Sequence, residues 1–408
     1  MEIREVTGGV CAAKGFKAAG VHAGFRKGDR KDMAMVFTGT PANAAGVFTT
    51  NVVEAAPVTY DREAVKKSKI QAVVVNSGVA NACTGAEGLN ICKKSAKKTA
   101  EVLGIPEESV ILGSTGVIGP QINFDILSHG IDILAPALGN DAKSAGDAAA
   151  SIITTDTHSK EVAVEFELGG KTCHMGAMAK GSGMIHPHMC TMLCYVCTDA
   201  AISHDMLQKA LSSVVVDTFN MISVDGDMST NDSLIVLANG EAGNAEITEE
   251  GNDYEVFKNA LNYICEKLAK MLAGDGEGAT ALFEVKVINA DTKENARTLA
   301  KSVICSNLTK AAIFGHDANW GRILCALGYS GVKFDPAKVD LYIESDYGKQ
   351  LIFTNGNEKE HSEEEASRIL SAKEVTAIAD MGSGIESATA WGCDLTYDYV
   401  KINADYRS

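Results

Sequence analysis

One stretch of the chain, residues 180–200 (KGSGMIHPHMCTMLCYVCTDA), concentrates residue types that can carry out covalent chemistry. In it, Thr191 follows a turn rich in glycine and proline and precedes an apolar run that begins at Met192. A threonine hydroxyl becomes an effective nucleophile when it is N-terminal, because its own α-amine, with a pKa of about 7.7–8.0, then takes the proton. Attack of the hydroxyl on the preceding carbonyl would create that amine by cutting the chain. The alternative is that Thr191 is an ordinary strand residue.

The same stretch also offers a set of metal-binding residue types. His186, His188, Cys190, Cys194 and Cys197 form the pattern H-x-H-x-C-x3-C-x2-C, whose members are zinc ligands in many proteins. Two of these cysteines lie in the apolar run MLCYVC, where strand spacing would point them to opposite faces. A second C-x2-C pair is absent from the sequence. Zinc or thiol binding at 186–197 is therefore the weaker alternative.

The elements that must position these residues can be read from hydrophobic periodicity. Alternation predicts a hairpin of strands 161–168 and 171–179 joined at Gly169 and Gly170. Further strands are expected at 34–37, 46–49, 72–75, within 110–119, and at 280–289, 339–344 and 350–353. Helices are expected at 90–103, 205–216, 255–272 and 294–305, with 142–150 compatible with a helix. This mixture predicts a layered α+β fold rather than a doubly wound sheet.

Composition narrows the class of protein. The 408 residues carry a formal net charge of -16, which opposes binding to nucleic acid. The cysteines number 11 and are scattered through apolar strings, as in reduced, buried thiols rather than in a disulfide framework. The sequence offers no apolar run long enough to span a bilayer and no secretory leader. A cytoplasmic enzyme without nucleic-acid or membrane partners is the expectation.

The chain resembles one known family over nearly its whole length. The resemblance is carried by the string KGSGMI-x-P-x-M-x-TML around Thr191 and by separated motifs in family order. These motifs are AAKGF (12–16), AGVFTT (45–50), NSGVAN (76–81), STGVIG (114–119), SVDGD (223–227), STND (229–232), NWGR (319–322) and AWGCDLTYDYVKIN (390–403). They are similar to those of the ornithine acetyltransferase, or glutamate N-acetyltransferase, family of arginine biosynthesis.

The resemblance implies an αββα-type sandwich, as in the aminopeptidase-like superfamily, and self-cleavage between Cys190 and Thr191. Fragments 1–190 (α) and 191–408 (β) would stay together, as an α2β2 assembly. Thr191 would carry an acetyl group from N-acetylornithine to glutamate, with acetyl-CoA as a further donor in some members and with no cofactor or metal. Relatives usually have Ala where Cys190 stands and Asn where His188 stands, which bears on the efficiency of cleavage.

Roles for individual residues also follow from the resemblance. Thr115 and Gly116 match the family's oxyanion hole, although without the resemblance Ser114–Gly116 would be taken as a turn. The matching substrate-binding positions are Thr154, Lys180, Thr191, Glu277, Asn403 and Ser408. It stays open whether Thr154 or its neighbour Thr155 contacts substrate.

Two other interpretations of the sequence are possible. The acidic run from Asp225 to Asp232 resembles a calcium loop, but its sixth position is Thr230 rather than Gly and its twelfth is Val236 rather than Glu. These residues are therefore expected to form turns and hydrogen bonds. A related amidohydrolase or aminopeptidase, in which water replaces the amino-acid acceptor, is the alternative enzyme.

Overall fold

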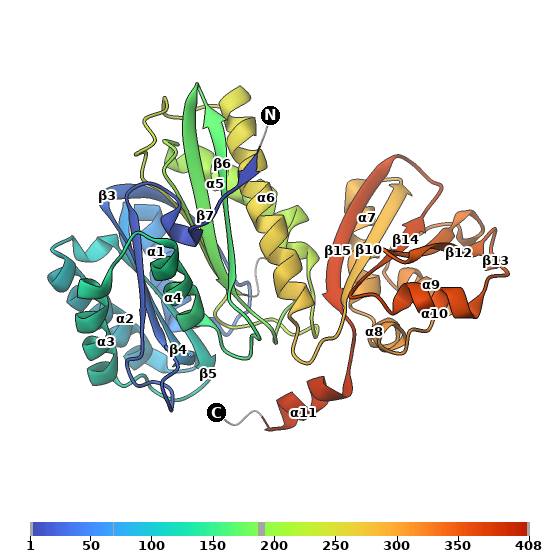
Figure 1. Cartoon of the computed structure of the whole chain (residues 1–408), viewed down its shortest axis with the longest axis horizontal. Helices are drawn as coiled ribbons and strands as arrows, with labels where there is room; N and C mark the ends of the chain where they lie inside the picture. Colours follow the sequence, from blue (N-terminus) through green and yellow to red (C-terminus); the bar gives the residue numbers. More distant parts are fainter. Residues whose placement is uncertain (1–2, 68, 187–191, 406–408) are drawn as a thin grey trace.

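The computed structural model describes residues 3–67, 69–186 and 192–405 and divides into two lobes (Figure 1). The larger lobe is built on a nine-stranded sheet of order β1-β6-β7-β8-β9-β3-β4-β5, with β2 also paired to β3. Its strands are β1 (Arg4–Glu5), β2 (Phe16–Val21), β3 (Met33–Phe48), β4 (Ile70–Val79), β5 (Val110–Val117), β6 (Lys160–Leu168), β7 (Lys171–Lys180), β8 (Leu193–Thr198) and β9 (Ser233–Ala238). Its helices are α1 (Ala56–Lys67), α2 (Gly85–Leu103), α3 (Phe124–Ala137), α4 (Ala142–Ile152), α5 (His204–Asp217) and α6 (Asn252–Gly274).

The long strand β3 folds this sheet back on itself. Its first part, from Met33, pairs with β2 and β4, and its last part, Asn43–Phe48, pairs with β9. The register shifts between Phe37 and Ala42, where the strand turns from one half of the sheet to the other. The sequence predicted two separate strands here, which was wrong, because the strand continues through the polar segment TGTPA from its pairing with β2 and β4 to its pairing with β9.

The three hydrophobic clusters of the chain give the order of the layers. An inner cluster lies between the two halves of the sheet, where Val75 and Ile111 of one half belong to the same cluster as Tyr195 and Ile235 of the other. Outside one half, α2 and α3 cover β4 and β5. Outside the other half, α5 and α6 cover β6 to β9. The order is helix, sheet, sheet, helix, which confirms the αββα sandwich.

The smaller lobe is a six-stranded sheet of order β13-β12-β11-β14-β10-β15 with helices packed around it. It contains β10 (Leu282–Ala290), α7 (Lys293–Ile304), α8 (Asn307–Phe314), α9 (Trp320–Gly328), β11 (Asp340–Ser345), β12 (Gly348–Thr354), β13 (Asn357–Glu358), α10 (Glu363–Leu370), β14 (Glu374–Asp380) and β15 (Glu386–Cys393). A final helix, α11 (Tyr397–Asp405), returns below the two lobes (Figure 1).

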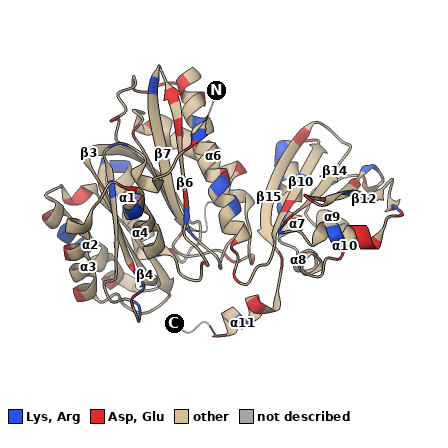
Figure 2. Ribbon diagram, in the orientation of Figure 1, with Lys and Arg blue, Asp and Glu red and all other residues tan. Residues whose placement is uncertain are grey.

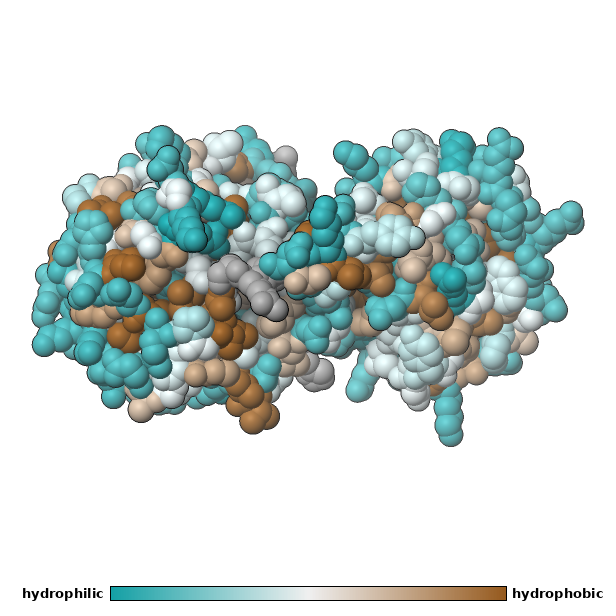
Figure 3. Space-filling view, turned by 90° about the horizontal axis from the view of Figure 1, so that it is seen from below, coloured by the Kyte–Doolittle hydropathy of each residue, from teal (hydrophilic) through white to brown (hydrophobic). Residues whose placement is uncertain are grey.

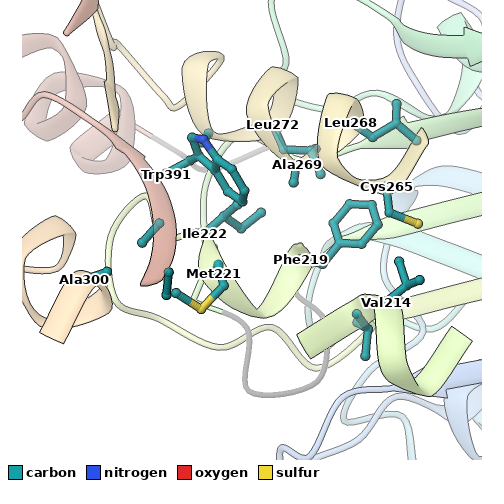
Figure 4. Packing of buried hydrophobic residues seen from close by; sticks show 14 of the residues in the cluster. Val214, Phe219, Met221, Ile222, Cys265, Leu268, Ala269, Leu272, Ala300 and Trp391 are labelled. Carbon is teal, nitrogen blue, oxygen red and sulfur yellow. The ribbon is translucent and has the colours of Figure 1, made fainter. Parts of the chain in front are cut away.

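The two lobes share one hydrophobic core, although the surface narrows between them (Figure 3). Trp391 of β15 lies beside Leu272 of α6 and Ile222 in the close-up of this core (Figure 4). The helix α6 contacts β6 and β7 of the larger lobe and β10 and β15 of the smaller one. Because α6 packs against the sheets of both lobes, its C-terminal end at Gly274 lies where the chain crosses from one lobe to the other.

Each helix that the sequence predicts is present, as α2, α4, α5, α6 and α7, whereas α1, α3 and α8 to α11 have no counterpart among the predicted elements. The β6–β7 hairpin turns at Gly169 and Gly170, and the side chain of Thr292 caps α7 by accepting a hydrogen bond from Asn295 N. The helix α2 begins at Gly85, five residues before the predicted Asn90. No helix in the described part of the chain has the length and apolar character that a membrane crossing needs. Basic and acidic residues are interspersed along the chain in both lobes (Figure 2).

Candidate active site

The end of β5 presents a hydroxyl and a glycine to a hollow in the larger lobe. The strand runs parallel to β4, so that Thr115 lies opposite Ser77 and Gly116 opposite Gly78. Gly116 has a φ of 127°, and a Cβ built on it would lie 2.3 Å from the carbonyl carbon of Gly78. Only glycine fits this approach of two backbones, so the position is more constrained than an ordinary turn.

Lys180, the last residue of β7, lies directly beside Thr115. Its side chain donates a hydrogen bond from Nζ to Thr115 Oγ1 at 3.4 Å, and the residue is 8 % exposed. Burial lowers the pKa of this ammonium, while the nearby carboxylate of Asp156 opposes the shift. A buried ammonium of this kind can bind the carboxylate of a small substrate.

Glu277 and Asn403 form a polar pair on another side of the same hollow. Asn403 of α11 donates a hydrogen bond from Nδ2 to Glu277 Oε2 at 2.7 Å. Glu277 follows the C-terminal end of α6, and its backbone N–H donates to Ser182 O at 3.1 Å. A Cβ on Gly183 would lie 2.4 Å from the Glu277 carboxyl group, so this glycine leaves room for it. The pair is suited to an ammonium group, which needs an acceptor with negative charge.

The segment that contains Thr154 and Thr155 completes the lining. Both threonines border the hollow, so the structure does not favour one of them as the substrate contact. The backbone of Thr154 is fixed at both ends: its N–H donates to Asp156 Oδ2 at 2.9 Å, and its carbonyl accepts from Arg30 Nη2 at 2.9 Å.

The sequence-predicted residues that the structure describes therefore surround one hollow of about 320 Å³. They are Thr115, Gly116, Thr154, Lys180, Glu277 and Asn403. Cys190, Thr191 and Ser408 lie outside the described residues. Six positions that span almost 290 residues of sequence meet here, which no local pattern in the chain could have shown.

The proposed zinc ligands that lie in the described part of the chain do not come together. Cys194 packs in the cluster beneath α5 and α6, whereas Cys197 packs in the cluster between the two halves of the sheet. These two thiols therefore lie on opposite faces of β8, as their spacing predicted, and they cannot bind one ion. His186 lies 3.1 Å from Ser223 Oγ through its Nδ1 atom, and His188 and Cys190 lie outside the described residues.

The acidic run 225–232 serves the site through hydrogen bonds, as expected. The carboxylate of Asp225 accepts from the backbone N–H groups of Met184 and Ile185, at 2.6 and 2.9 Å. Asn231 donates from Nδ2 to Ser114 O and Ala80 O, at 2.8 and 2.6 Å. The first carboxylate fixes the turn after Lys180, and the amide fixes the end of β5.

Sequence reasoning missed three residues behind the hollow, namely Asp156, Lys160 and Asp275. They form a buried charged cluster in which the Lys160 ammonium lies between two carboxylates. A weak signal was present, because Asp156 and Lys160 are four residues apart at the start of an otherwise half-buried strand. The third member lies 115 residues from Lys160, so the sequence did not reveal that the lysine is buried.

A second, larger hollow of about 530 Å³ adjoins the first. The two share Gly116, Val117, Thr154 and Thr155, and the second is also bordered by the basic side chains of Arg26, Lys27 and Arg30. On a chain of net charge -16, three cations at one hollow make it a favourable place for an anionic group.

Fold and site together define a class of protein. An αββα sandwich encloses a polar hollow with an ammonium, a carboxylate, a hydroxyl and a tightly packed glycine backbone, which is the arrangement of an enzyme for small charged substrates.

The chain belongs to the ArgJ family, whose sequence model matches residues 17–408. It is 52 % identical to the arginine biosynthesis bifunctional protein ArgJ of Caldanaerobacter subterraneus over 396 residues, which cover 97 % of each chain. It is similar to the crystal structure of an ArgJ protein from Bacillus halodurans, with a TM-score of 0.50, 46 % identity, and coverage of 52 % of this chain and 98 % of that one. An ornithine acetyltransferase from Mycobacterium tuberculosis, crystallised with ornithine, aligns at 35 % identity with a TM-score of 0.43, over 47 % of this chain and 100 % of that one. The chain is thus an acyltransferase of arginine biosynthesis.

Proposed function

We propose that this enzyme moves an acetyl group from N-acetylornithine to glutamate through an ester on Thr191. The α-amine of Thr191 takes the hydroxyl proton, and Oγ attacks the acetyl carbonyl. The C–N bond breaks, ornithine leaves with the proton on its amine, and the acetyl group stays on Thr191. The amine of glutamate then attacks the ester, and the hydroxyl regains its proton. No cofactor is needed, because the ester itself carries the acetyl group.

The observation that carries this proposal is the lining of the 320 Å³ hollow. Lys180 would bind the α-carboxylate of either amino acid, and Glu277 with Asn403 would bind the distal ammonium of ornithine. The Thr115 hydroxyl and the Gly116 N–H would donate to the oxygen that becomes negative in the tetrahedral intermediate. Charges of both signs at one hollow fit substrates that are themselves zwitterions.

We also propose that Thr191 gains its amine by self-cleavage after Cys190, which gives fragments 1–190 and 191–408. The ends of the segment concerned lie side by side, because Lys180 of β7 pairs with Leu193 of β8. The Bacillus halodurans chain supports a division near the middle, since it matches over 98 % of its length and yet spans about half of this protein. An α2β2 assembly in the cytoplasm is part of the same proposal.

Acetyl-CoA is proposed as a second donor. The basic hollow beside Gly116 supports this, because Arg26, Lys27 and Arg30 border a space that adjoins the acetyl-binding end and suits phosphate groups. The acetyl thioester would reach Thr191 by the same path as the acetyl amide of N-acetylornithine.

The experiment that tests the function combines intact-mass spectrometry with N-terminal sequencing of the protein and of Thr191→Ala. We expect two fragments from the parent, one of them beginning TMLCYV, and a single uncut chain from Thr191→Ala. The matched control is Cys190→Ala, which should still be cut because it keeps the nucleophile.

Transfer from N-acetylornithine and from acetyl-CoA to glutamate is measured beside hydrolysis of each donor. An uncut parent chain would contradict the mechanism. Hydrolysis that greatly exceeds transfer would favour the amidohydrolase alternative.

A further inference from the structure

A cluster of four charged side chains lies directly behind the substrate hollow. The Lys160 ammonium is completely buried and donates hydrogen bonds to Asp156 Oδ1 at 2.8 Å and to Asp275 Oδ2 at 2.5 Å. Both carboxylates are also buried, with side-chain exposures of 0 % and 3 %. Lys180 is the fourth charged side chain, because Asp156 accepts a hydrogen bond from the N–H of the next residue, Gly181, and its charge acts on the Lys180 ammonium.

Asp156 connects this cluster to two segments of the hollow. Its Oδ2 accepts from Thr154 N at 2.9 Å, and its Oδ1 accepts from Gly181 N at 2.7 Å. Gly181 follows Lys180, so one carboxylate fixes the backbone at two predicted substrate-binding positions. The resulting geometry cannot relax unless Asp156 moves.

Asp275 connects the cluster to the third segment. It accepts from Lys160 through its side chain, and its backbone carbonyl accepts from Ser182 Oγ at 2.7 Å. The carbonyl of Ser182 in turn accepts from Glu277 N at 3.1 Å. The backbones at Thr154, Lys180 and Glu277, which come from distant parts of the sequence, are therefore held against one fully buried ammonium.

The contribution of this cluster to the stability of the fold does not by itself explain why its members are charged. A buried ion pair contributes little net stability, because desolvation of the charges offsets their attraction, and apolar residues of similar volume often serve as well. A neutral side chain such as Asn could also accept the hydrogen bonds from Thr154 N and Gly181 N, but it could not provide a negative charge next to Lys180. The charged groups with the largest effect on the Lys180 ammonium are Asp156, Lys160, Asp232 and Arg26.

The directions of the pKa shifts agree with this geometry. Burial would raise the pKa of Asp156, but the ammonium groups of Lys180 and Lys160 outweigh burial and hold it below its usual range. Burial raises the pKa of Asp232 well above its usual range, so this carboxyl is a weaker source of negative charge. Asp156 is thus the main fixed anion facing Lys180.

We propose that Asp156, held by Lys160 and Asp275, is a positioning residue of the active site that fixes Lys180 and keeps its ammonium charged for binding the substrate carboxylate. The inference rests on the proposed function of Lys180. Asp156 itself does not touch substrate in this proposal, because it lies behind Lys180 and Thr154.

The test is Asp156→Asn, with KM for N-acetylornithine and kcat measured between pH 6 and 10. Without the anion, Lys180 should lose its proton at lower pH. We therefore expect KM to rise about tenfold or more at alkaline pH, with the rise beginning at lower pH than in the parent and kcat changed less. The double variant, Asp156→Asn combined with Lys180→Arg, should not show this rise in KM at alkaline pH, because a guanidinium group keeps its charge throughout this pH range.

The matched control is Asp199→Asn. Asp199 is also a buried carboxylate that accepts from backbone N–H groups, those of Lys14 and His174, but it lies at the opposite end of β8. The Asp199→Asn substitution should lower the stability of the protein without shifting the pH dependence of KM for N-acetylornithine. The proposal is overturned if Asp156→Asn behaves like Asp199→Asn, with lower stability and an unshifted KM profile.

The protonation of Lys180 can also be measured without an activity assay. Lys180 is trace-labelled with acetic anhydride at a series of pH values, and mass spectrometry measures the extent of labelling at each pH. An earlier onset of labelling in Asp156→Asn than in the parent supports the inference, even for a protein that shows no acetyl transfer. In that case the proposed function fails while the inference on Asp156 stands. An onset at the same pH in both proteins overturns the inference.

Discussion

Among the residues of the hollow, Thr115 carries the hydroxyl that we propose stabilises the tetrahedral intermediate. It accepts from Lys180 Nζ, which leaves its own proton available to a negatively charged oxygen in the hollow. Replacement by valine keeps the shape and the strand and removes only the donor. We expect Thr115→Val to lower kcat by about 10²–10³-fold with little change in KM, as for other single oxyanion donors.

Steady-state kinetics on both half-reactions check this prediction. Ser77→Ala serves as the control, since Ser77 faces Thr115 across the β4–β5 pair but donates its hydroxyl to Ser151 O, away from the hollow. It should cost about 1 kcal/mol of stability and leave kcat unchanged. A Thr115→Val enzyme with the parent kcat would assign the hydroxyl to strand packing alone.

The sequence predicted some residues of the site and missed others. Thr115, Lys180 and Glu277 were placed by resemblance to a family, and the structure brings them to one hollow. Lys160 was not singled out, because a lysine reads as exposed unless its partners are known, and Asp275 is far away in the sequence. Buried charges depend on tertiary partners, which local patterns do not contain.

At the scale of elements, one buried carboxyl joins α1 to the strand that carries Thr115. Asp61 Oδ1 accepts from Leu112 N of β5 at 2.9 Å, and Oδ2 has no hydrogen-bond partner among the described residues. Burial raises the pKa of Asp61 well above its usual range, although the Leu112 hydrogen bond opposes this. The folded protein therefore prefers the neutral acid.

Because the pKa of Asp61 is raised in the folded protein, the free energy of unfolding should fall as the pH rises. Stability is greatest below the unfolded pKa of about 3.9 and is lost as pH rises toward the folded pKa. We expect Asp61→Asn, which keeps an acceptor for Leu112 N, to raise the free energy of unfolding by about 1–3 kcal/mol at pH 8 and by much less at pH 4. Thermal unfolding at the two pH values measures this.

Asp132→Asn is the control for this prediction, because Asp132 is half exposed and forms a surface ion pair with Lys98 at 2.7 Å. A surface pair contributes about 0–1 kcal/mol, so a small change at either pH is expected. Equal stabilities of Asp61→Asn and the parent at pH 8 would contradict the conclusion that burial disfavours a charge on Asp61.

Hydrophobic periodicity predicts some helices and strands correctly and others wrongly. The helices α5 and α7 follow the sequence because one face of each is buried and a side chain caps the first turn. The strand β3 was divided in two because Gly39, Thr40 and Pro41 resemble a turn, and only pairing with distant strands keeps the segment extended. The second lobe was not separated from the first, since one core runs through both.

At the scale of the whole molecule, α11 brings the C-terminal end of the chain to the active site. None of its residues is buried, and its contacts include the ring of Tyr397 against Phe314 and Asn403 with Glu277. Removal of residues 397–408 should therefore cost at most about 1 kcal/mol of stability, as expected for surface changes, while raising KM for N-acetylornithine about tenfold or more.

Calorimetry and substrate kinetics on the truncated chain test this prediction. Asn403→Ala in the full-length chain is the companion variant, and it should reproduce part of the KM increase. A truncated enzyme with the parent KM would show that the amide does not orient Glu277. A truncated chain that fails to fold would contradict the peripheral packing of α11.

The order of strands in the larger sheet has a consequence for a chain cut between β7 and β8. The strands β8 and β9, from the second fragment, lie between β7 and β3, both from the first. Neither fragment could close the sheet alone, so the sheet would have to form before the chain is cut. The two products would then be made in a one-to-one ratio and already paired, and mixing them after separate synthesis should not restore the enzyme.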